Sequence, residues 1–136
     1  MVTRRESLTG LASLAGMATS SSWLSAAGAS QDDVSVRTFA IDELVSQRAS
    51  SGRPYLPFLD LPTLRCGLYV LAAGAEDGQS PHDTDEVYYT LSGKAKITVE
   101  GEVEPVEAGS VIYVKAHAEH RFVDIEEELR LLVFFD

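Results

Sequence analysis

The feature that most constrains the fold is a run of short apolar segments, separated by turn-forming residues, that continues from Leu64 to the end of the chain. The expected strands are 64–73, 86–91, 94–99, 103–106, 110–114, 120–125 and 129–135. Tight turns are expected at 92–93 and 100–101, and an acidic solvated turn at 126–128. Regularly spaced short strands without a long helix predict an all-β protein, built as an antiparallel sandwich or barrel.

Residues 30–63 are expected to precede the barrel as an N-terminal strand, a short helix and an apolar loop. Residues 34–39 alternate between apolar and polar side chains, as in a strand, and 41–50 have the apolar spacing of a short helix. Residues 53–62 contain three prolines among apolar side chains, which predicts an apolar loop that covers the core or a partner subunit.

The first 29 residues have the pattern of an export signal. Arg4 and Arg5 precede a weakly apolar run rich in Ala, Gly and Ser, and 27–29 is a small-x-small cleavage signal. The run is interrupted too often to span a bilayer. This segment resembles a twin-arginine translocation leader, mostly unstructured or helical, and an amphipathic or disordered N-terminus is the alternative. Cleavage would leave a mature protein that is periplasmic, cell-surface or extracellular.

Charge and cysteine content limit the partners and the source of stability. The formal net charge is −10, so both nucleic acid and anionic membranes would repel the protein, and no stable membrane association is expected after cleavage. Cys66 is the single cysteine and cannot form an internal disulfide, so the domain must be held by its core. Cys66 shares strand parity with Leu64 and Leu68, which predicts a small buried residue.

Three side chains are candidates for a metal site. His82, Glu86 and Tyr88 are separated by even numbers of residues and therefore share one face of an extended segment. His120 begins a later strand, which a hairpin-rich barrel would return beside the first. Two imidazoles and one carboxylate suit manganese, iron, nickel or zinc, with open positions for water or substrate.

Other polar residues nearby are expected to have structural roles. His117 lies at an odd spacing from His120, which places it on the opposite face, as a surface or turn histidine. Asp83 and Asp85 have the wrong parity relative to His82 and are expected to face solvent or to cap the turn.

Residues 64–135 resemble a small single-domain cupin of the conserved-barrel kind. Residues that match the two cupin motifs are Gly74, His82, Glu86 and Gly93 in the first, and Gly109 and His120 in the second. Ser80 stands in place of the first motif's other histidine. Lys115 and His117 replace the proline and glycine that are usual in the second motif.

The resemblance implies a double-stranded β-helix, or jelly-roll barrel, over residues 64–136. It implies that His82, Glu86 and His120 are three of the usual four metal ligands. Ser80 would then hydrogen-bond a bound water or substrate, or form the turn before Pro81, and Tyr88 would line the pocket or simply pack in the core. A homodimer is implied as well, with 55–61 and 129–135 as candidate contacts unless both cover their own core.

Two functions remain open. In one, the barrel is a metal-dependent oxygenase, isomerase or decarboxylase whose metal binds a small anionic or oxygen-rich molecule. In the other, it is a non-catalytic module that binds a small molecule or metal, with a degenerate site. The second stays open because Ser80 and Tyr88 are the only further polar groups on the expected face, and neither is a strong base.

Overall fold

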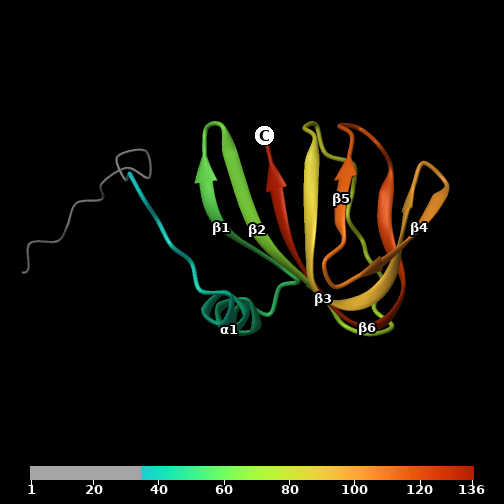
Figure 1. Ribbon diagram of the computed structural model, residues 1–136, viewed down its shortest axis with the longest axis horizontal. Helices are drawn as coiled ribbons and strands as arrows, with labels where there is room; N and C mark the ends of the chain where they lie inside the picture. Colours follow the sequence, from blue (N-terminus) through green and yellow to red (C-terminus); the bar gives the residue numbers. More distant parts are fainter. Residues whose placement is uncertain (1–34) are drawn as a thin grey trace, which may run out of the picture.

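The structure is a computed structural model, and it describes residues 35–136. The predicted export signal, 1–29, lies outside the described residues. The elements, in chain order, are α1 (Ile41–Ser51), β1 (Tyr55–Leu61), β2 (Leu64–Leu71), β3 (Glu86–Val99), β4 (Glu102–Glu107), β5 (Val111–Val114) and β6 (His120–Phe135) (Figure 1). The prediction of an all-β protein is confirmed, with one helix ahead of the strands.

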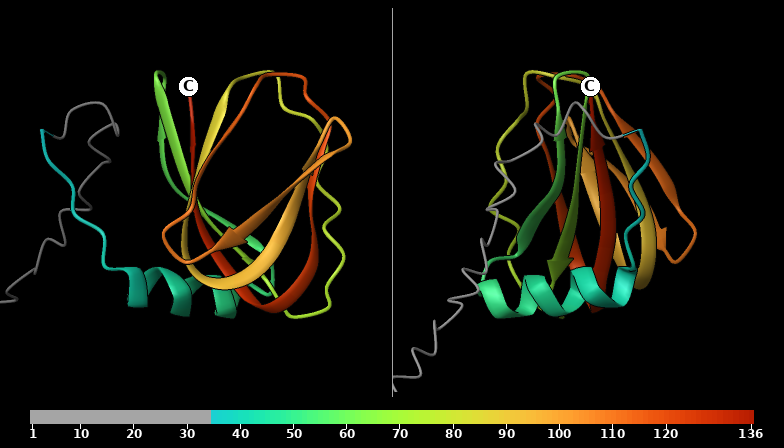
Figure 2. Two further views of the ribbon diagram at one scale, coloured as in Figure 1. Left: turned by 45° about the vertical axis from the view of Figure 1, so that its right-hand side comes forward. Right: turned by 90° about the vertical axis from the view of Figure 1, so that its left-hand side faces the viewer.

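All strand pairs are antiparallel, in the order β1-β2-β6-β3-β4, with β5 beside β3. The long strands β3 and β6 pair along most of their length, from Glu86 opposite Phe135 to Val99 opposite His120. Both strands bend, so each contributes to the two halves of the barrel, as the views in Figure 2 show. This bend brings the first residue of β3 and the first residue of β6 to face each other across the barrel interior.

Two predicted turns are wrong, because 92–93 and 126–128 lie inside continuous strands. The register between β3 and β6 shifts on both sides of Gly93, so the strands bend there without reversing direction. Gly93 has φ 103°, and a Cβ atom at this position would lie 2.3 Å from the Glu128 carbonyl oxygen. The glycine therefore allows a bend and a close backbone approach, which the sequence pattern alone cannot distinguish from a turn.

The apolar segment 53–62 is also not a loop, since β1 occupies most of it and pairs with β2. β1 lies at the sheet edge, where Pro57 removes no essential ladder hydrogen bond, and the register shifts between Pro57 and Leu59. The expected strand at 34–39 is wrong for its described part, because residues 35–39 contain no strand.

The predicted helix is confirmed as α1. It ends at Gly52, whose φ of 67° gives the left-handed cap that glycine adopts at low cost. Leu44 is buried against Leu68 and Val70, so α1 covers the outer face of β2. Within the described part of the chain, no helix has the length and apolar character needed to cross a membrane.

A second apolar cluster fills the barrel interior, with Tyr69, Tyr88, Phe122, Leu129 and Leu131 among its buried members. β1 and β6 both contribute to the chain's own apolar clusters. The segment between β2 and β3 runs along β6, where the Gly74 amide donates to the Ile125 carbonyl at 2.8 Å. It closes one side of the barrel and leads directly into the predicted metal ligands.

Candidate metal centre

The structure brings His82, Glu86 and His120 together. One ligand atom from each of the three residues lies within 4.8 Å of the others. Glu86 and His120 are the first residues of β3 and β6 and are 1% and 2% exposed, whereas the His82 side chain, in the preceding loop, is 37% exposed. The cluster thus has two buried members and one member that faces the cavity described below.

The geometry of Glu86 suits a cation. His120 Nε2 lies 2.6 Å from Glu86 Oε1, and His82 Nε2 lies 3.7 Å from Glu86 Oε2. Both carboxylate oxygens are buried, yet neither has a hydrogen-bond partner in proper geometry among the described residues. A buried carboxylate that accepts no well-formed hydrogen bond is costly, and two imidazole nitrogens beside it form a donor set that divalent transition metals accept. The residues present therefore fit a metal ion.

Backbone contacts orient the two imidazoles. His120 Nδ1 donates to the Ala118 carbonyl at 2.8 Å, which leaves Nε2 as the nitrogen available to a metal in the neutral ring. The His82 carbonyl accepts a hydrogen bond from the His117 amide at 2.7 Å. Burial alone would lower the pKa of His120, but Glu86 and the Ala118 carbonyl outweigh it and raise that pKa.

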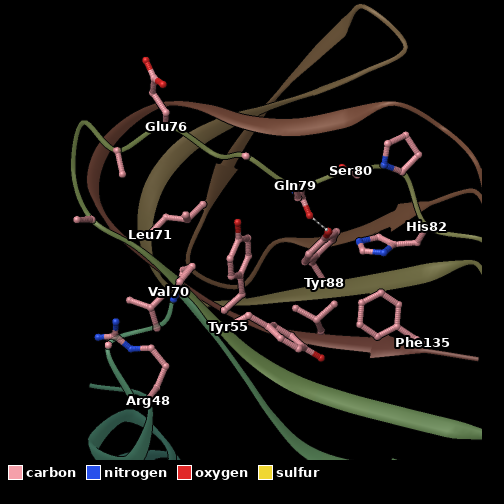
Figure 3. A pocket seen from close by; sticks show the side chains of 18 residues that line it. Arg48, Tyr55, Val70, Leu71, Glu76, Gln79, Ser80, His82, Tyr88 and Phe135 are labelled. Carbon is pink, nitrogen blue, oxygen red and sulfur yellow. Dashed lines mark hydrogen bonds between the residues drawn. The ribbon is translucent and has the colours of Figure 1, made fainter. Parts of the chain in front are cut away.

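A hydrogen-bond chain leads away from this cluster, and Figure 3 shows its link between Tyr88 and Gln79. The Tyr88 hydroxyl lies 3.2 Å from His120 Nε2 and donates to Gln79 Oε1 at 3.0 Å. Gln79 Nε2 in turn donates to Asp77 Oδ2 at 2.7 Å, which fixes the direction of the Gln79 amide. Burial and the nearby Glu86 charge raise the pKa of Tyr88, so the phenol keeps its proton at neutral pH.

Asp77 is the last acceptor of this hydrogen-bond chain and holds it in place. Asp77 is buried and accepts hydrogen bonds from the Tyr69 hydroxyl at 2.6 Å, from the backbone amide of Gln79 at 3.2 Å and from the backbone amide of Phe122 at 2.8 Å. Burial, followed by the hydrogen bond to Asp77, raises the pKa of Tyr69. Asp77 therefore joins the β2–β3 segment to β6 beside the ligands.

A cavity of about 750 Å³ opens onto the cluster from the side of His82. Much of its wall is aromatic or aliphatic, including Tyr55, Leu71 and Phe135 (Figure 3). Gly67 makes room for this wall, since a Cβ atom there would lie 2.2 Å from the Tyr55 ring. The volume is typical of a small-molecule site.

The other polar residues considered in the sequence lie outside the histidine–glutamate cluster. Ser80 is exposed and lines the cavity, outside the histidine–glutamate cluster. Tyr88 is buried and lines both the cavity and the core. His117 is a turn residue with a 74% exposed side chain, as predicted. Asp85 caps the turn by accepting from the Ala116 amide, and Asp83 is exposed.

Sequence reasoning missed Asp77 and Gln79. Both lie in a segment without regular secondary structure, where alternation gives no indication of which side chains turn inward. The only available signal was their position just before the motif histidine.

Comparison with known sequences gives consistent matches. The Cupin_2 family, described as "Cupin domain", matches residues 67–135. An uncharacterized protein of Streptomyces coelicolor is 47% identical over 100 residues, which covers 74% of this chain and 95% of that protein.

Solved structures with the same fold include two enzymes. A mutant of salicylate 1,2-dioxygenase from Pseudoaminobacter salicylatoxidans, in complex with gentisate, matches with a TM-score of 0.60 and 20% identity over 71% of this chain. The DMSP lyase DddQ from Ruegeria pomeroyi matches with a TM-score of 0.56 and 17% identity over 60% of this chain. The chain spans 31% of the dioxygenase and 45% of the lyase.

A third match is not described as an enzyme. The cupin domain of Cnp3 from Schizosaccharomyces pombe has a TM-score of 0.54 and 20% identity, and the alignment covers 60% of this chain and 61% of that one. At these identities the structural likenesses show the fold alone.

Proposed function

This chain belongs to the cupin family, and we propose that it holds one divalent metal ion through His82, Glu86 and His120 and binds, or acts on, a small anionic or oxygen-rich molecule. The observation that carries the proposal is Glu86, a carboxylate 1% exposed that lies 2.6 Å from His120 Nε2 and 3.7 Å from His82 Nε2. Its two oxygens accept no hydrogen bond of proper geometry among the described residues. A carboxylate in this position is stabilised by a cation, and two imidazoles beside it complete the donor set.

The metal would supply Lewis-acid polarisation of an oxygen donor, and with two neutral imidazoles and one carboxylate the centre keeps a charge of about +1, which favours anionic ligands. Manganese, iron, nickel and zinc all suit these donors. The Ala118 carbonyl holds the proton of His120 on Nδ1, away from the ligand nitrogen.

The surrounding residues bind and orient the small molecule. The Tyr88 hydroxyl keeps its proton and directs it to Gln79, so its oxygen is available to accept a hydrogen bond on the side of His120. Much of the cavity wall is apolar and would contact the apolar part of such a molecule. Ser80, at the cavity wall, offers a hydroxyl to a ligand that reaches His82.

Turnover is the first candidate, as a metal-dependent oxygenase, isomerase or decarboxylase. The similar folds of salicylate 1,2-dioxygenase and DMSP lyase support an enzyme. A non-catalytic binding module is the second candidate, because the cavity residues Tyr88 and Ser80 offer hydroxyl groups and neither is a strong base.

Metal titration tests the proposal. Purified metal-free protein is titrated calorimetrically with manganese, iron(II), nickel and zinc, together with His82→Ala, Glu86→Gln and His120→Ala. Each variant is expected to lose more affinity than the roughly 10- to 100-fold cost of outer-shell changes. His117→Asn is the matched control, since this exposed histidine lies outside the cluster and should leave affinity unchanged. Equal affinity in the parent and all three ligand variants would refute the site.

A further inference from the structure

The cavity contains a second charged position, Arg48, on its far side from the metal cluster. Figure 3 shows Arg48 on α1 and His82 at the opposite side of the cavity, and both residues line it. Arg48 lies one helical turn after the buried Leu44, so it projects from the same face of α1 toward β2. Arg48 thus places a cation among the residues that line the cavity.

Arg48 differs from three arginines on the strands whose guanidinium groups have partners. Its Nε atom is buried and has no hydrogen-bond partner among the residues that the structure describes. By contrast, Arg121 and Arg130 pair with Glu119 and Glu128 at 3.3 and 2.9 Å. Arg65 stacks on Phe135 and donates to Thr84.

A guanidinium group that has an unpaired nitrogen and belongs to a residue lining the cavity favours a ligand that brings an acceptor to it. Arginine presents its donors in a planar fork that matches the two oxygens of a carboxylate or a similar oxyanion. Glu76 is the one acidic residue among those that line the cavity, and it is exposed to solvent.

The wall between the two polar positions is apolar. Tyr69, Leu71, Ala75 and Val133 line it, with the Tyr55 ring on the side of β1. A ligand that reaches both ends must therefore have an apolar or aromatic body.

We propose that Arg48 binds the oxyanion of an elongated ligand whose other end reaches the metal cluster, so that the ligand is an amphipathic carboxylate with a metal-binding oxygen group at its far end. This inference rests on the proposed metal site and specifies the ligand class for it. The length of the ligand is set by the distance across the cavity, which a series of probes can measure.

Alkyl hydroxamates provide such probes, because a hydroxamate chelates divalent metals and the opposite end of the chain can be varied. Zinc-loaded protein is titrated calorimetrically with hydroxamates that have about two to eight methylene groups and end in either a carboxylate or a methyl group. At the matching length, the carboxylate is expected to bind tighter by about 10-fold or more. The advantage should disappear in Arg48→Met, shrink in Arg48→Lys and persist in Arg53→Met, which removes the same charge outside the cavity.

The outcomes separate this inference from the metal proposal. If hydroxamates bind in a metal-dependent manner but the carboxylate gives no advantage at any length, or the advantage survives in folded Arg48→Met, Arg48 does not bind the ligand and the metal site stands. If zinc itself fails to bind, the proposed function fails and this inference fails with it. Thermal unfolding of each variant verifies that the fold is intact.

Discussion

At the residue scale, the burial of the Cys66 thiol links its ionisation to the stability of the fold. The thiol is buried on β2, as its parity predicted, and burial raises its pKa. The folded state thus favours the neutral thiol, and this contribution to stability is present below about pH 8.5, where the unfolded thiol is also neutral. It is lost as the pH rises further, because only the unfolded chain ionises readily.

We therefore expect the free energy of unfolding of the parent, measured relative to Cys66→Ala by urea denaturation, to fall between pH 7 and pH 9.5. A thiol reagent at pH 8 should also modify the native protein on the order of 1,000-fold more slowly than the urea-unfolded chain. Native labelling as fast as unfolded labelling would show that Cys66 is accessible.

Strand parity predicted that Glu86 and Tyr88 share one face of β3, and both side chains are buried. His82, Glu86 and His120 come together, but His82 lies in the loop before β3 and His120 on another strand, so parity alone does not bring them together. His117 lies in an exposed turn, as predicted. Gln79 and Arg48 could not be placed in this way. Their positions depend on the path of a loop and on how a helix packs against the sheet, and neither has a period in the sequence.

At the element scale, the β2–β3 segment is held to β6 by Asp77. We expect Asp77→Ala to lower the free energy of unfolding by about 2–4 kcal/mol, because the Phe122 amide and the Tyr69 hydroxyl lose their acceptor in a buried position. Glu76→Ala, an exposed neighbour, is the control and should change stability by less than about 0.5 kcal/mol. Urea denaturation measures both, and equal effects would show that Asp77 does not anchor the segment.

The strands show what a local pattern can and cannot indicate. The glycine and acidic residues at 92–93 and 126–128 were interpreted as turns, but the sheet continues through both. A bend in a long strand and a hairpin turn use the same residues, and only the pairing of β3 with β6 distinguishes them. In the same way, proline is typical of loops, yet Pro57 is tolerated in β1 because this strand lies at an edge.

At the scale of the whole molecule, the fold was predicted from strand spacing and motif resemblance together, and the family match agrees with it. A homodimer stays a prediction. The segments proposed for its contact, 55–61 and 129–135, are β1 and the end of β6, and they contribute to the chain's own clusters. Apolar side chains that are exposed lie elsewhere, with Tyr89, Val111 and Tyr113 close together on the paired strands β3 and β5.

Export also concerns the whole molecule. If 1–29 is a twin-arginine leader, intact mass spectrometry of the exported protein should give a mature chain that begins at Ser30. Replacing Arg4 and Arg5 with lysine should leave the protein in the cytoplasm, whereas Arg53→Lys should not affect export. A parent protein found only in the cytoplasm at full length would contradict the leader.

The most direct test of the central claim is anomalous diffraction from crystals grown with manganese. We predict one strong peak bonded to His82 Nε2, His120 Nε2 and the Glu86 carboxylate, at about 2.0–2.3 Å from each, as is typical of metal–ligand bonds. No peak among these three side chains, or a peak only at the exposed acidic residues 126–128, would contradict the account.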